Sequence, residues 1–148
     1  SECRLVGPPV ALPSDLVESS GVAAGIRSPC LVWTHNDGGR GPFLYAVDRD
    51  VRVRGQIELN QPDPDWEDIA HGRCDLGVFL YVADTGDNDE HREFISLYRL
   101  AEPEGEGDRK VDSERYRMML LDGARDIEAM YVLPLEQIFF VTKGRKPD

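Results

Sequence analysis

The chain has 148 residues, of which 28 are acidic and 17 basic, and its formal net charge at pH 7 is −11. This length fits one domain, and the negative charge disfavours binding to nucleic-acid phosphates or to an anionic membrane surface. No apolar run is long enough to span a bilayer, so cations, small molecules and other proteins are the expected partners.

The predicted elements are short β-strands separated by turns rich in Gly, Pro, Asp and Asn. In chain order, the expected strands are residues 30–34, 43–48, 52–59, 68–71, 78–83, 94–100, 116–121, 127–133 and 137–142. Helical periodicity is hard to find, and the sequence therefore predicts an all-β fold. The polar stretch 102–112 (EPEGEGDRKVD) is expected to be a solvated loop.

A repeated unit becomes visible when these segments are aligned. The three units pair ESSGVAAG (18–25) with LVWTHND (31–37), WEDIAHG (66–72) with LYVADTGDN (80–88), and DIEAMYV (126–132) with IFFVTKG (138–144). Each unit has a glutamate at the start of one strand, a turn, a second apolar strand and a polar loop. Repeats of about 40–50 residues with about four strands each are typical of β-propeller blades. We therefore expect blade-like units at about 18–60, 66–121 and 126–148.

The repeat and the length together predict a partial β-propeller. The chain accommodates about two and a half blades of four-stranded antiparallel sheet, whereas a closed propeller needs at least about four. We expect residues 1–148 to form a single, incomplete domain, the N-terminal part of a six-bladed propeller, or one that a second chain completes. Residues 4–12 are a candidate strand for closing the ring.

Several motifs carry a resemblance to known proteins. They are WTHNDGG (33–39), LYAVDRD (44–50), DWEDIAHG (65–72), LYVADTGDN (80–88), LYRLAEP (97–103) and the DIEAMYV and IFFVTKG pair. With these motifs the chain resembles a family of bacterial β-propeller proteins that is loosely similar to β-propeller phytases and to the gluconolactonase family. The resemblance covers nearly the whole chain and implies export to the periplasm or the medium. It leaves the activity open.

Two hairpins depart from the family pattern. Val51 and Leu135 stand where the pattern and turn chemistry favour glycine. Because a bulky residue is disfavoured at positive φ, these hairpins are expected to use another turn or to be strained.

The strand-opening glutamates are the leading candidate ligands. In an antiparallel hairpin the start of the first strand lies beside the end of the second, so each glutamate should lie near the polar loop of its own unit. In a propeller the first strand of each blade lines the central channel. Glu18, Glu67 and Glu128 are therefore expected to converge at one mouth.

Convergent carboxylates favour a bound cation. Calcium accepts six to eight oxygen ligands in flexible geometry, so Ca²⁺ is the expected ion, with Mg²⁺ or Mn²⁺ as alternatives. The expected ligands are Glu18, Glu67, Glu128, Asp84 and Asp87. The resemblance to phytases and gluconolactonases implies the same metal-bearing channel mouth.

A metal at the mouth suggests hydrolysis of phosphate esters or lactones. The ion would polarise a phosphoryl or carbonyl oxygen and activate water, with Glu67 or His35 as base and Lys143 holding an anionic substrate group. The competing hypothesis is a non-catalytic exported propeller that binds protein or glycan. Propellers host many functions, so the fold does not choose between the two.

Structural roles compete with each of these assignments. Residues 84–88 are preferred turn formers, and salt bridges to arginines would also explain the glutamates. Trp33 and Trp66 are expected to pack between blades. Cys3, Cys30 and Cys74 form an odd set that permits at most one internal disulfide, and their spacing does not decide the pairing.

Overall fold

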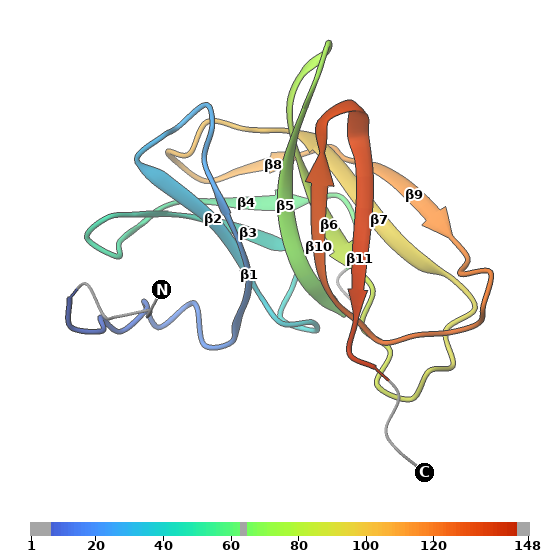
Figure 1. Cartoon of the computed structure of the whole chain (residues 1–148). Coiled ribbons are helices and arrows are strands. Elements are labelled where there is room, and N and C mark those ends of the chain that lie inside the picture. Colours follow the sequence, from blue (N-terminus) through green and yellow to red (C-terminus); the bar gives the residue numbers. More distant parts are fainter. Residues whose placement is uncertain (1–6, 63–64, 145–148) are drawn as a thin grey trace.

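The computed structural model describes residues 7–62 and 65–144, which form an all-β structure of three sheets (Figure 1). The first sheet contains β1 (Ser19–Ala24), β2 (Leu31–Asn36), β3 (Phe43–Asp48), β4 (Val53–Leu59) and β8 (Arg109–Val111). The second contains β5 (Trp66–Cys74), β6 (Gly77–Asp84), β7 (Ile95–Ala101) and β9 (Glu114–Met118). The third contains β10 (Ile127–Leu133) and β11 (Gln137–Thr142), joined by the 3₁₀ turn η1 (Pro134–Glu136).

The all-β prediction is confirmed, and strands 43–48, 127–133 and 137–142 have the predicted bounds. The other predicted strands overlap observed ones. Adjacent strands pair antiparallel, except that β8 pairs parallel with β4. The sheets follow the three predicted units apart from β8, which lies between β7 and β9 in the chain but joins the first sheet.

The prediction of a solvated loop at 102–112 is only partly correct, because residues 104, 106–108 and 112 are exposed loop, whereas Glu102 is buried and residues 109–111 form β8. The carboxylate of Glu102 is fully buried and accepts hydrogen bonds from the backbone N–H groups of Ile26 and Arg27 and from Nε1–H of Trp33. A buried charge is stable only when donors surround it in this way. The segment therefore crosses to the first sheet and adds β8, instead of turning freely in solvent.

The sheets are stacked in chain order, and their opening strands β1, β5 and β10 lie next to one another (Figure 1). Trp33 and Trp66 are both fully buried in the core shared by the first and second sheets, which confirms that the tryptophans pack between units. A second core joins the second sheet to the third through Tyr81, Leu97 and Met130. Across residues 7–62 and 65–144, no helix has the length and hydropathy of a membrane span.

Both atypical hairpins adopt the strained alternative. Val51 has φ of 60° and Leu135 has φ of 66°, in the left-handed region that favours glycine. The predicted closing strand at 4–12 is not seen in its described part, because residues 7–12 form no strand. Residues 4–6 lie outside the described residues.

Candidate functional site

Two β-bulges place glutamates at the starts of the opening strands. In β5, Trp66 pairs with Asp84 and Asp68 with Ala83, so Glu67 is an extra residue. In β10, Glu128 is extra in the same way, between residues that pair with Thr142 and Val141. A bulge re-aims the side chain at the extra position. Both glutamates therefore leave the regular alternation of their strands at the same end of the sheets.

The same backbone contact recurs in each unit and gives the structural alignment. The N–H groups of Asp37, Thr85 and Lys143 donate to the carbonyls of Glu18, Asp65 and Asp126 at 2.7, 3.2 and 3.0 Å. Glu18 is thus equivalent to Asp65 and Asp126, and Ser20 to Glu67 and Glu128. The glutamate predicted for the first unit, Glu18, therefore stands two residues before the position that Glu67 and Glu128 occupy in their units.

Glu18 accordingly lies outside the group of carboxylates that gathers at the other two glutamates. Its carboxylate is exposed and pairs with the Arg40 guanidinium at 2.8 Å. Glu18 therefore does not converge with Glu67 and Glu128, and a different set of acidic residues surrounds those two glutamates.

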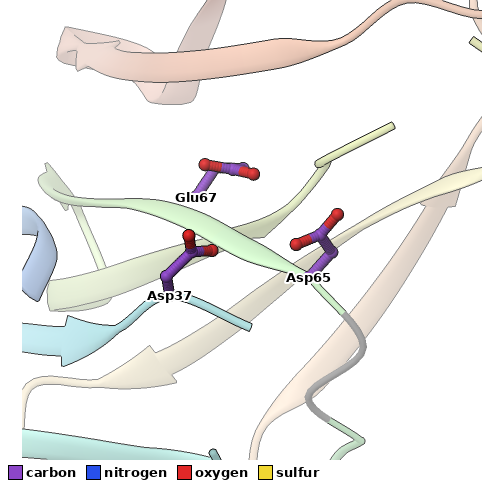
Figure 2. Close-up of side chains that lie close together, drawn as sticks. All are labelled: Asp37, Asp65 and Glu67. Atoms are coloured by element: carbon purple, nitrogen blue, oxygen red, sulfur yellow. The ribbon is translucent and has the colours of Figure 1, made fainter. Parts of the chain in front are cut away.

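Five carboxylates form two groups that share Glu67. Asp37, Asp65 and Glu67 make one group, and Glu67, Asp126 and Glu128 make the other, with ligand atoms within 4.8 Å of one another in each. We call these five residues the carboxylate rim. Figure 2 shows the first group, in which the loop after β2, the residue before β5 and the β5 bulge each contribute one side chain.

The rim raises the pKa of its central members. Burial, followed by the charges of Asp37 and Glu128, raises the pKa of Glu67 to about 7. Burial and then the charge of Asp37 also raise the pKa of Asp65. At neutral pH, Glu67 is therefore divided between its acid and its carboxylate. A cation bound among these oxygens would favour the carboxylate form.

Lys143 is a basic partner of the rim. Its ammonium lies 2.7 Å from Glu128 and 3.4 Å from Asp126. Burial raises the pKa of Asp126, but the Asp87 N–H and Lys143 together outweigh burial and hold that pKa below its usual value. Lys143, predicted to bind substrate, thus neutralises the edge of the rim formed by the third unit.

The end of β6 and the loop that follows it, which carry Asp84 and Asp87, position the rim. Asp84 is fully buried and accepts hydrogen bonds from Arg92 and from the Tyr98 hydroxyl, both at 2.9 Å. The carboxylate of Asp87 accepts the N–H groups of His91 and Arg92, and its own N–H donates to Asp126. Both predicted ligands are engaged in holding the loop and lie outside the two carboxylate groups.

Gly86, in the same loop, lies directly against the rim. A Cβ at this position would be 2.3 Å from an Asp65 carboxylate oxygen and 2.4 Å from one of Glu67. Glycine therefore allows the backbone of the second unit to approach the two carboxylates closely.

Asp68 joins the three opening strands. It accepts a hydrogen bond from the Met130 N–H at 2.6 Å, which connects β5 to β10. On the other side, a Cβ at Gly21 would lie 2.5 Å from its Oδ1, so β1 packs tightly against it. Asp68 thus fixes the spacing of the strands that carry the rim.

His35, the predicted base, is fully buried. Its Nδ1–H donates to the Asn36 carbonyl at 2.7 Å, its ring packs edge-on against Trp66, and its Nε2 has no hydrogen-bond partner. Burial lowers its pKa, so it is neutral at pH 7. It belongs to neither carboxylate group.

Glu67 and Glu128 were predicted as ligands from the sequence, whereas Asp37, Asp65 and Asp126 were not. A signal was present, since DWE and DIE repeat the pattern D-x-E at the same place in two units. Both cysteines in the described part of the chain, Cys30 and Cys74, are free thiols.

Comparisons with known proteins add no relative to this picture. A scan against protein-family models, a search of curated proteins and a search of solved structures each returned no match.

Proposed function

We propose that this chain is part of a β-propeller and that its carboxylate rim binds a divalent cation. The observation that carries the proposal is the position of Glu67, which belongs to both carboxylate groups. Five acidic residues, against the basic residues Lys143 and Arg92, leave an excess of negative charge that a divalent ion would compensate.

The donor set favours a hard cation. All the candidate ligand atoms are carboxylate oxygens supplied by strand ends and loops of three units. Calcium suits such a set because it accepts many oxygens in variable geometry, while Mg²⁺ requires a near-ideal octahedron and retains more water. We therefore place Ca²⁺ first and keep Mg²⁺ and Mn²⁺ as competing ions.

The propeller assignment is supported by the arrangement of the three sheets. Their opening strands are adjacent, each of the first two sheets contains four antiparallel strands, and the contact at the strand start repeats three times. This pattern agrees with blades arranged around a channel. The family resemblance, and with it export from the cell, remains part of the proposal.

Hydrolysis of a phosphate ester or a lactone is the finer form of the proposal. A cation at the rim would polarise the phosphoryl or carbonyl oxygen of a substrate. Glu67 is the better placed base, because it belongs to both carboxylate groups and would lie beside a water on the bound ion. His35 is fully buried and lies outside the carboxylate groups, so it is the weaker candidate for the base.

A scaffold role is the second candidate, and one specific observation favours it. The third sheet exposes an apolar face, with Tyr131 and Phe139 stacked at 4.9 Å between ring centroids and exposed by 47% and 42%. Exposed aromatic surface of this kind is typical of binding sites for other proteins.

Thermal unfolding with added cations tests the proposal. At a concentration one hundred times the Kd, a bound ion stabilises by about 2.7 kcal/mol, which is about 5–10 °C for a chain of this size. We expect Ca²⁺ to raise the Tm of the protein, EDTA to reverse the shift, and Glu67→Gln to abolish it.

Glu18→Gln is the matched control, because Glu18 pairs with Arg40 outside the rim. It should keep the wild-type shift. Equal shifts in both variants, or no shift with Ca²⁺, Mg²⁺ or Mn²⁺, would contradict the proposal. Assays of phosphatase and lactonase activity, with and without the stabilising ion, then separate hydrolysis from binding alone.

A further inference from the structure

The sequence contains two Asp-Gly pairs, Asp37–Gly38 and Asp122–Gly123. In such a pair the backbone nitrogen of the glycine can attack the side-chain carboxyl carbon of the aspartate and close a five-membered ring. Glycine allows this because it has no Cβ to hinder the approach and leaves the backbone free to adopt the ring geometry. Both pairs lie in connections between strands, so the protein contains two sites with the same local chemistry and different surroundings.

The fold brings the reacting groups of the first pair together. The Gly38 N–H donates to Oδ1 of Asp37 at 2.7 Å, so the nitrogen lies directly against the carboxyl group that it would attack. Asp37 is exposed, and its nearest charged neighbours in the first carboxylate group are Asp65 and Glu67 (Figure 2). Ring closure replaces its carboxylate by a neutral imide and so relieves the repulsion among these three charges.

The backbone around Gly38 is free to move during ring closure. The pair lies between β2, which ends at Asn36, and β3, which begins at Phe43. The Gly38 N–H donates to a side chain and not to a neighbouring strand, so this step breaks no strand pairing. Gly39 and Gly41 follow with φ of 83° and 95°, and a Cβ at Gly39 would meet no atom within 4 Å.

The second pair is held in a different way. The Gly123 N–H donates to the Leu120 carbonyl at 3.3 Å, and the Asp122 carboxylate pairs with the Arg125 guanidinium at 3.3 Å. The glycine nitrogen is therefore engaged with the backbone, and the carboxyl group is held by a cation. Both contacts oppose attack of the nitrogen on the carboxyl carbon.

We propose that Asp37 is a site of spontaneous conversion to isoaspartate. The Gly38 nitrogen forms a bond to the carboxyl carbon of Asp37 and loses its proton, while a carboxyl oxygen leaves as water. Water then adds to the former main-chain carbonyl of Asp37 and breaks its bond to that nitrogen. The product has the same composition as the original chain, with the peptide bond now made through the side-chain carbon. Water is the one co-reactant, and it is released and taken up in equal amounts.

Conversion changes the carboxylate rim. In isoaspartate the free carboxylate is attached directly to Cα, and the main chain is longer by one carbon. The carboxylate of residue 37 then no longer extends on a methylene toward Asp65 and Glu67, so the first carboxylate group loses a member. The reaction itself does not depend on cation binding at the rim.

Ageing of the intact protein tests the proposal. After prolonged incubation at pH 6, trypsin releases residues 28–40 and 118–125, each with one Asp-Gly pair. Mass spectrometry with electron-transfer fragmentation distinguishes isoaspartate from aspartate in both peptides. In the folded protein we expect isoaspartate to form at least about tenfold faster at residue 37 than at residue 122. In urea the two rates should lie within about twofold, because unfolding removes the contacts that distinguish the pairs.

Gly38→Ala keeps Asp37 and adds a Cβ beside the attacking nitrogen. It should slow conversion at residue 37 at least about tenfold and leave the rate at residue 122 unchanged. Residue 122 is the control in every sample, since unfolding of a variant would speed its conversion.

Two results would overturn the proposal. One is equal rates at residues 37 and 122 in the folded protein, and the other is a rate at residue 37 that Gly38→Ala leaves unchanged. Saturating Ca²⁺ separates this inference from the proposed cation site, because an Asp37 carboxylate bound to the ion should convert more slowly while residue 122 does not change. Conversion at residue 37 that Ca²⁺ does not slow would contradict Asp37 as a ligand and leave its isomerisation established.

Discussion

Cation binding should release a proton from Glu67, by an amount that changes with pH. With a pKa of about 7, Glu67 carries about 0.9 proton at pH 6 and about 0.1 proton at pH 8. A cation that requires the carboxylate displaces this proton, so release should fall from near one to near zero between these values. Apparent affinity should fall up to tenfold for each pH unit below 7.

Calorimetric titration with Ca²⁺ in two buffers of different ionisation enthalpy measures the protons released. Glu67→Gln should bind far more weakly, with no release in this pH range. Release at pH 6 below about 0.3 proton, or independent of pH, would refute the assignment of Glu67 as a ligand with a raised pKa.

The same pKa fixes the sign of the pH dependence of stability. The folded pKa of Glu67 lies above its ordinary value of 4.5, so between these values the folded state binds more protons than the unfolded state. Glu67 therefore makes the cation-free protein less stable as pH rises from about 4.5 to 7. Saturating Ca²⁺ should remove or reverse this slope, and Tm measured across the window in EDTA and in Ca²⁺ tests it.

Four further substitutions, one of them a control, test the contacts described above. Glu102→Ala leaves buried donors unpaired and should lower the free energy of unfolding by about 3–5 kcal/mol in urea titrations, whereas Glu104→Ala, at an exposed side chain, should change it by less than about 0.5 kcal/mol. Gly86→Ala should push the rim carboxylates apart and weaken Ca²⁺ binding while leaving Tm in EDTA little changed, and equal affinities would show that the close approach is unimportant. Leu135→Gly relieves positive φ at an 85% exposed residue and should raise stability by about 0.5–1 kcal/mol, which a loss of stability would contradict.

Much of the fold could be predicted because the strands are short apolar runs punctuated by turn residues. The bounds of 43–48, 127–133 and 137–142 follow from this punctuation alone. By contrast, β8 has three residues (RKV) in a polar stretch, and its pairing with β4 depends on a contact 52 residues away in sequence. Glu102 resembles its exposed neighbours until Trp33 and the N–H groups of Ile26 and Arg27 are brought to it.

The candidate site was predicted in part for a related reason. Glu67 and Glu128 open equivalent strands, and the repeat brings them together. The first unit breaks the pattern, because its bulge carries Ser20 where the others have glutamate, so alignment by glutamate selected Glu18. Only the backbone register reveals this offset.

The other acidic members of the rim follow from contacts between units. Asp37 reaches Glu67 of the second unit, and Asp126 receives a hydrogen bond from the Asp87 N–H. Strand prediction within a single unit does not capture such contacts. It also does not distinguish Asp84, which turns inward to Arg92 and Tyr98, from the acids that face the rim.

Anomalous diffraction from crystals grown with Mn²⁺ shows directly whether a cation binds at the carboxylate rim. Mn²⁺ prefers the same oxygen donors as calcium and magnesium and scatters anomalously. We expect a peak at coordination distance, about 2.0–2.6 Å, from a Glu67 carboxylate oxygen, with further ligands from the rest of the carboxylate rim. A rim without a peak, in crystals whose Mn²⁺ is bound elsewhere, would contradict it.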